Sequence, residues 1–419
     1  MSHAKKFVLL AGAAISLVGV NSALAQSNDE TRAVVAEMLS DSQNRTSLLA
    51  DAGHDAKGFM ISGEGFTLRV GGQIQFRYVA NFRDEDSTSN EFEPGFQTRR
   101  TKLWFGGNIV NEKWKYFVQG AFDRDEGGSF GLEQAWVSYD FGSGFYSKWG
   151  QYKLAFLREE NISSSKQLAA ERSIANEFFN QDYSQGIALG YKADAWRFEA
   201  SFSDGLGSRN TDFTSSAEAD WALTGRAEFK IDGDWDQFDD FTAPRGGKFG
   251  ALIGAAVHYQ DSANTSAPTD VDMQYLGYTV DVSLEGDGWN AYGAFMGRNL
   301  DTRGPVGAGD ADATDDFGFV IQGGLRVAEN TEIFARWDAV FLDEDTVVSG
   351  EDNFHFLTVG LNQYYAGHAA KATLDFVYSF SETSPNFGGG FGGLGTGTGV
   401  LGDTEEGEVV VRAQFQLLF

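Results

Sequence analysis

Residues 66–82 read FTLRVGGQIQFRYVANF, and apolar and polar side chains alternate along this stretch. Phe66, Leu68, Ile74 and Phe76 fall on one face, and polar residues fall on the other. Successive side chains of a β-strand point to opposite faces, so a period of two predicts a strand with one apolar face and one polar face. The last segment, residues 407–419, reads GEVVVRAQFQLLF and repeats the pattern. Strands of a soluble sandwich alternate in the same way, so the pattern alone does not distinguish a sandwich from a membrane barrel.

The number and length of such segments separate these two folds. Most segments run to about ten residues or more, which matches the ~9–11 residues that a tilted strand needs to cross a bilayer, whereas soluble strands average ~5–6 residues. Sixteen strands of this length are too many for one sandwich. The predicted strands are 66–82, 98–110, 114–123, 132–141, 145–152, 183–192, 196–204, 220–231, 250–260, 274–285, 289–298, 316–327, 331–341, 354–364, 370–380 and 407–419.

The connections between these segments alternate between short and long. Tight turns such as 142–144 and 286–288 alternate with long polar connections such as 83–97 and 153–182. Membrane barrels place short turns at the periplasmic end and long loops outside. The pattern therefore predicts an all-β protein, a 16-stranded antiparallel transmembrane β-barrel over residues 58–419 in an outer membrane, with lipid as a partner. One connection, 232–249, is long where the pattern expects a short turn.

The N-terminus carries a secretory signal. Lys5 and Lys6 precede an apolar stretch at 7–20, and Ala23-Leu24-Ala25 is a small-residue cleavage motif, so residues 1–25 are predicted to be a signal peptide. Residues 26–57 show helical spacing and are predicted to be a short periplasmic helical segment.

Composition excludes several classes of function. The chain has 419 residues, no cysteine and a formal charge of −28, which argues against disulfide scaffolds, thiol chemistry and nucleic-acid binding. The Gly-rich run 388–399 has no helix after it, so a dinucleotide site is not expected. Acidic clusters near Asp232 and Asp310 are interpreted as solvated loops rather than calcium sites. We expect no cofactor, no metal and no catalytic residue; a barrel lipase stays a minor alternative.

The polar faces of the strands carry more basic than acidic side chains. The basic ones are Arg69, Arg77, Arg100, Lys102, Lys115, Lys192, Arg197, Arg226, Lys230, Arg298, Arg326, Arg336, Lys371 and Arg412. The acidic ones are Asp123, Glu199, Glu228, Asp281, Glu332, Asp338, Asp375 and Glu408. A positive wall in a narrow channel raises the local concentration of anions. The alternative is that many of these arginines form ion pairs with acids and brace the barrel.

The connection 153–182 is long and contains candidate helices. In sixteen-stranded porins the loop after the fifth strand commonly folds inward, and this connection has that place in the order of strands. The charged residues that would set the constriction are Arg158, Glu159, Glu160, Lys166, Glu171 and Arg172. The alternative is an ordinary surface loop.

Two stretches resemble a known family. Residues 150–156 (GQYKLAF), followed by Glu159, Ser163–Ser165 and Glu171-Arg172, resemble the strand-and-loop signature of the phosphate-selective porin O/P family. Residues 360–365 (GLNQYY) with Gly367-His368 resemble its penultimate hairpin. The resemblance implies a sixteen-stranded outer-membrane homotrimer of a Gram-negative-type bacterium. It also implies passive transport of small hydrophilic solutes, with phosphate held in some members by pore arginines and lysines.

Together, these features predict an anion-biased porin. The competing hypothesis is a structural or adhesive barrel with an occluded lumen. Stepwise currents in a planar bilayer distinguish the two.

Overall fold

The computed structural model describes residues 59–84, 91–122, 128–215, 218–262, 272–303, 313–347, 350–383 and 395–419. The predicted signal peptide 1–25, the predicted helical segment 26–57 and Asp123 lie outside these residues. Within the described part of the chain, no helix is long and apolar enough to cross a membrane.

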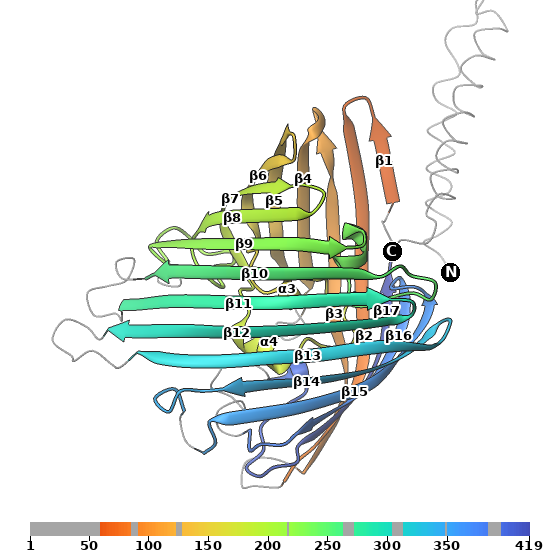
Figure 1. Cartoon of the computed structure of the whole chain (residues 1–419), viewed down its shortest axis with the longest axis vertical. Helices are drawn as coiled ribbons and strands as arrows, with labels where there is room; N and C mark the ends of the chain where they lie inside the picture. The colour runs from red at the N-terminus through yellow and green to blue at the C-terminus, as the bar shows by residue number, and fades with distance from the viewer. Residues whose placement is uncertain are drawn as a thin grey trace, which may run out of the picture. The chain divides into compact units, whose positions relative to one another are not determined.

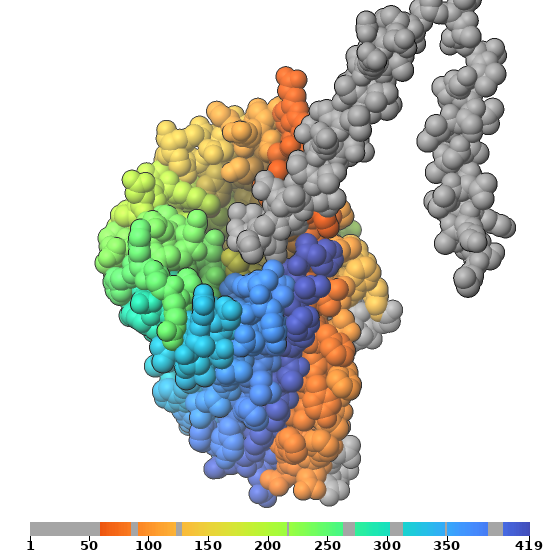
Figure 2. All heavy atoms as spheres, turned by 90° about the vertical axis from the view of Figure 1, so that its right-hand side faces the viewer, coloured from red at the N-terminus to blue at the C-terminus, as the bar shows by residue number. Residues whose placement is uncertain are grey.

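The strands form one antiparallel sheet that closes on itself (Figure 1). Each strand from β2 to β16 pairs with the next along the chain. β17 then pairs with β2, so that Val409 lies opposite Phe82 and Leu418 opposite Gln73. Figure 2 shows this seam, where the dark-blue C-terminal strand lies against the orange first strands. The prediction of a sixteen-stranded antiparallel barrel is confirmed.

The strand bounds are close to those expected from the sequence. The ring consists of β2 (Phe66–Phe82), β3 (Phe92–Ile109), β4 (Asn111–Phe122), β5 (Phe130–Gly142), β6 (Phe145–Lys153), β7 (Tyr183–Lys192), β8 (Trp196–Ser203), β9 (Trp221–Asp232), β10 (Gly250–Asp261), β11 (Asp272–Gly286), β12 (Trp289–Arg303), β13 (Thr314–Ala328), β14 (Thr331–Phe341), β15 (Asn353–Ala366), β16 (Ala370–Ser379) and β17 (Val409–Leu418).

Two strands differ most from the prediction. A seventeenth strand, β1 (Phe59–Gly63), forms a hairpin with the start of β2 and was not predicted. Its Met60 breaks the apolar alternation and the strand has only five residues, which explains why the pattern misses it. β3 begins at Phe92 rather than at residue 98, and Pro94 lies within it, opposite Ala80.

Apolar and polar side chains are distributed the opposite way from a soluble protein. Phe76, Leu189 and Val257 are among many large apolar side chains exposed on the outer face, whereas Arg77 and Asp338 are fully buried inside. An outer face of this kind is favourable when hydrocarbon surrounds it. The buried polar groups of the lumen must then find partners in one another or in loops that enter the barrel.

Candidate functional site

The connection between β6 and β7, residues 154–182, lies inside the barrel and is called the inward loop below. It contains the short helices α3 (Arg158–Asn161) and α4 (Ile174–Phe179). Its main-chain oxygens accept hydrogen bonds from the far wall: Asn362 Nδ2 donates to Leu168 O (2.8 Å), and Lys371 Nζ donates to Gln167 O (2.8 Å). The loop is therefore fixed to β15 and β16, on the side of the barrel opposite β7 and β8.

Glu171 of the inward loop is the centre of a cluster with three arginines, Arg77, Arg99 and Arg100. The nearest nitrogens lie 2.6, 2.7 and 2.7 Å from its carboxylate oxygens. Burial alone would raise the pKa of Glu171, but the charges of Arg100, Arg99 and Arg77 outweigh it and hold this pKa well below its usual range. One negative charge thus meets three positive charges, and we call this group the Glu171 cluster.

A β-bulge supplies the third arginine. Gln75 pairs with Arg100 and Phe76 pairs with Thr98, so Arg99 is the extra residue of β3. Strict alternation would turn Arg99 toward the lipid. The bulge instead lets Arg99 and Arg100 both reach Glu171. Sequence reasoning missed Arg99 because nothing in the alternation marks the bulge.

Arg172 holds the other side of the inward loop together. Its guanidinium donates to the main-chain oxygens of Glu159 (3.0 Å), Glu160 (3.1 Å) and Ile162 (2.9 Å). It also forms an ion pair with the Glu160 carboxylate at 3.2 Å, and that carboxylate accepts from Lys153 as well. Arg172 was predicted to set selectivity, and its contacts make it a support for the chain around α3.

The long connection between β9 and β10 enters the barrel from the other end. It contains a 3-10 helix, η1 (Trp235–Asp239), and its Phe238 and Phe241 are buried. Arg158 donates to Phe238 O, and Phe241 N donates to Lys166 O (3.4 Å). This turn, which the sequence could not explain, therefore contacts the inward loop directly.

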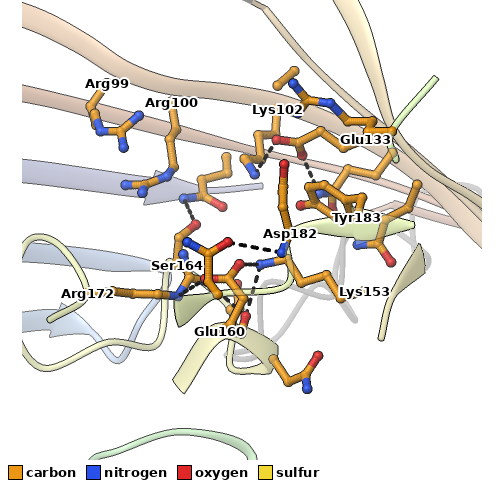
Figure 3. Close-up of a pocket in the computed structure, with 18 of the residues that line it drawn as sticks. Arg99, Arg100, Lys102, Glu133, Lys153, Glu160, Ser164, Arg172, Asp182 and Tyr183 are labelled. Atoms are coloured by element: carbon orange, nitrogen blue, oxygen red, sulfur yellow. Dashed lines mark hydrogen bonds and ion pairs between the residues drawn. The ribbon is translucent and has the colours of Figure 1, made fainter. Parts of the chain in front are cut away.

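Two cavities remain between the inward loop and the wall formed by β3 to β9. The first, of about 720 Å³, is lined by the Glu171 cluster's Arg99 and Arg100 together with Lys102 and Arg172 (Figure 3). Among the described residues, six basic and four acidic side chains line it. The second, of about 390 Å³, has seven basic and three acidic side chains. Lys153, Asn161 and Ser163 line both, so the cavities meet at these residues.

Some of the predicted basic residues line the cavities, and some are buried in ion pairs. Arg100 and Lys102 line the first cavity, and Lys192, Arg197 and Arg226 line the second. Arg336 and Arg412 are buried and paired with Asp338 and Asp375.

The remaining basic residues have other surroundings. Arg77 belongs to the Glu171 cluster, Lys230 lies over the Trp235 ring, and Arg326 lies over the Tyr364 ring. Arg69 and Lys115 share the lumenal faces of β2 and β4 but line neither cavity.

The predicted loop residues are spread along the same passage. Glu160 lines the first cavity, and Arg158 and Lys166 line the second. Glu159 is buried and accepts hydrogen bonds from Ser173 N (2.8 Å) and Oγ (2.6 Å). Besides Arg99, seven further charged residues of the passage were not predicted: Glu133, Lys148, Lys153, Glu177, Asp182, Arg209 and Asp239. Alternation or loop position could have indicated all of them except Glu133, which is the extra residue of a β-bulge in β5.

Comparison with known proteins agrees with this architecture. A family model described as phosphate-selective porin O and P matches residues 68–366. The chain belongs to that family. It is a porin of the Gram-negative outer membrane. A search of curated protein sequences gives no match.

Solved outer-membrane channels are similar in fold. DcaP of Acinetobacter baumannii has 14% identity and a TM-score of 0.57, covering 86% of this chain and 99% of its own. An anion-selective porin from Comamonas acidovorans has 11% identity and a TM-score of 0.56, covering 84% and 100%. Salmonella typhi OmpF has 12% identity and a TM-score of 0.57, covering 86% and 100%. At these identities the likeness concerns the fold alone.

Proposed function

We propose that this porin lets small hydrophilic anions diffuse passively through the two cavities, and that inorganic phosphate is one of them. The observation that carries the proposal is the Glu171 cluster, in which three guanidinium groups surround one carboxylate beside the first cavity. Arginine guanidinium groups match the geometry of phosphate and carboxylate oxygens. A positive wall of low dielectric constant raises the local concentration of anions and lowers their barrier to passage.

The excess of basic groups along the whole passage supports the same proposal. It persists although the mature chain is strongly acidic overall, and although ion pairs with wall acids neutralise several buried arginines. The relevant lumenal charges are therefore those of β3 to β9, which line the two cavities. The transport requires neither a bound cofactor nor a catalytic residue.

Single-channel recording tests the proposal. The purified porin in a planar bilayer should give stepwise openings, and its reversal potential in a potassium chloride gradient should indicate anion preference. Millimolar phosphate should reduce the chloride current. Absence of openings would favour the adhesive or structural barrel, and cation preference would refute the anion bias. A chloride current that phosphate does not reduce would refute the proposal that phosphate is one of the permeating anions.

We further propose that the porin assembles as a homotrimer. A structure of Vibrio cholerae OmpT, similar to this chain with a TM-score of 0.54 at 12% identity, is described as a trimer form. Native mass measurement in detergent tests the assembly, and a monomeric mass would refute it.

The N-terminal proposals are that residues 1–25 are removed on export and that residues 26–57 form a helical segment. N-terminal sequencing of the mature protein should begin at Gln26. Circular dichroism of a peptide covering 26–57, in water and with the porin in detergent, tests the helix.

A further inference from the structure

Three aromatic side chains form a row on the lumenal face of neighbouring strands. Trp104 on β3, Phe117 on β4 and Trp136 on β5 are roughly parallel, with ring centroids 6.0 Å and 5.7 Å apart. Alternation places Trp104 on the same face as Lys102, and Phe117 itself lines the first cavity. We call these three residues the aromatic row.

Glycines on adjacent strands let two of these rings lie against the wall. A Cβ on Gly71 would collide with the Trp104 indole, and a Cβ on Gly106 would lie 3.0 Å from the Phe117 ring. A ring that covers a glycine has one face on the sheet, so its other face is turned to the lumen. All three side chains are half-buried rather than enclosed.

Exposed aromatic surface in a watery lumen needs an explanation, because the outer face already offers hydrocarbon for apolar side chains. The row lies between basic groups on both sides along the strands. Lys102 precedes Trp104 by two residues on β3, and Lys115 precedes Phe117 by two residues on β4. Two residues of a strand span roughly 7 Å. A ring stacked on the row therefore lies within reach of an ammonium group.

We propose that the aromatic row is a lumenal binding site for small organic anions that carry a flat aromatic ring. The ring stacks on Trp104, Phe117 and Trp136, and the anionic group meets Lys102 or Arg100. The neighbouring cavity of about 720 Å³ lies in the ~300–1,000 Å³ range of small-molecule sites. This site deepens the proposed permeation route, because it names a class of solute that the route would retain.

Equilibrium titration of the full-length porin in detergent tests the site with three monoanions: benzoate, cyclohexanecarboxylate and acetate. Stacking of a base on an aromatic side chain is worth enough to change affinity roughly tenfold or more. We expect benzoate to bind at least roughly tenfold more tightly than acetate, and more tightly than cyclohexanecarboxylate. Equal binding of benzoate and acetate, or of benzoate and cyclohexanecarboxylate, would overturn the proposal.

Variants locate the site. Trp104→Leu combined with Trp136→Leu should remove the preference for benzoate over acetate. The matched control is Trp114→Leu, because Trp114 is exposed on the outer face, and it should leave the preference unchanged. If the double variant does not fold, Phe117→Leu should weaken benzoate severalfold while Trp104→Phe retains it. A preference that survives both Trp104→Leu with Trp136→Leu and Phe117→Leu would place binding elsewhere and refute the row.

Failure of the binding site and failure of the proposed transport can be told apart. Chloride currents are recorded on the same preparations, and their absence refutes transport. The titration needs no current, so it decides the binding site in either case.

Discussion

At the scale of single residues, Glu171 partly neutralises the positive charge of Arg77, Arg99 and Arg100. Its carboxylate neutralises one of three converging arginines and also ties the inward loop to β2 and β3. Sequence alone could identify Glu171, Arg77 and Arg100 as candidates, because alternation and loop position mark them. It could not bring them together, since the contact depends on how the loop folds back. The convergence is a tertiary property.

Glu171→Gln should increase anion preference. The substitution removes one negative charge among three positive ones, and a unit charge at 4 Å is worth about 1 kcal/mol even in bulk water. The permeability ratio of chloride to potassium should therefore rise roughly fivefold. Reversal potentials measure it. Glu329→Gln, in the exposed turn after β13, makes the same charge change outside the lumen and should have no effect. An unchanged ratio in Glu171→Gln would show that permeating ions avoid the cluster.

Glu177 should make the selectivity depend on pH. Burial, followed by the negative charge of Glu160, raises the pKa of Glu177 to about 7, and this residue lines the first cavity. The carboxyl is mostly ionised at pH 8 and mostly neutral at pH 6, so anion preference should rise as the pH falls between these values. Reversal potentials across this range measure the change. Glu177→Gln should flatten the profile, and an equally steep profile in that variant would assign the titration to another group.

At the scale of elements, side-chain hydrogen bonds and ion pairs stabilise the inward loop, because its helices are short. α3 and α4 have four and six residues, too few to be stable alone. The three carbonyl groups that Arg172 contacts fix the path of the chain between them. The loop therefore depends on a few charge-assisted hydrogen bonds.

Arg172→Ala should widen the channel. Hydrogen bonds to charged groups contribute about 1.5–3 kcal/mol each, and this change removes three. We expect a higher single-channel conductance, because the loop around α3 loosens. Arg209→Ala removes the same charge from the same cavity at an exposed position and should change selectivity with little change in conductance. Equal conductance in Arg172→Ala and the native porin would contradict this role.

Periodicity predicted the elements well and their details less well. A period of two is imposed by the lipid on one side and water on the other, so every strand of the ring was predicted. The bulge at Arg99 was missed, because it reverses the faces within one strand: Phe96 faces out and Arg100 faces in, although both positions are even. The 3-10 helix η1 was also missed, since its Phe238 and the following Phe241 contact a loop distant in sequence.

At the scale of the whole molecule, the ring depends on one seam between β17 and β2. A sheet that is not closed leaves unpaired main-chain groups, which hydrocarbon does not satisfy. All sixteen strands are therefore needed together, whereas β1 lies outside the ring.

Deleting residues 409–419 should abolish folding of the barrel, while deleting residues 59–63 should not. The first deletion removes β17 and opens two edges; the second removes only the hairpin partner of β2. Heat-modifiable mobility on a gel, together with protease resistance in vesicles, measures folding. A folded barrel without β17 would show that the seam is dispensable.

The contact between the inward loop and the connection that joins β9 to β10 has a further effect. Phe241 N donates to Lys166 O, and Arg158 donates to Phe238 O. The inward loop is therefore bound by the connection between β9 and β10 as well as by the barrel wall. A segment restrained at both ends samples fewer conformations than a loop tethered only at its base. The open state should consequently carry a quiet current, with little flicker between conductance levels.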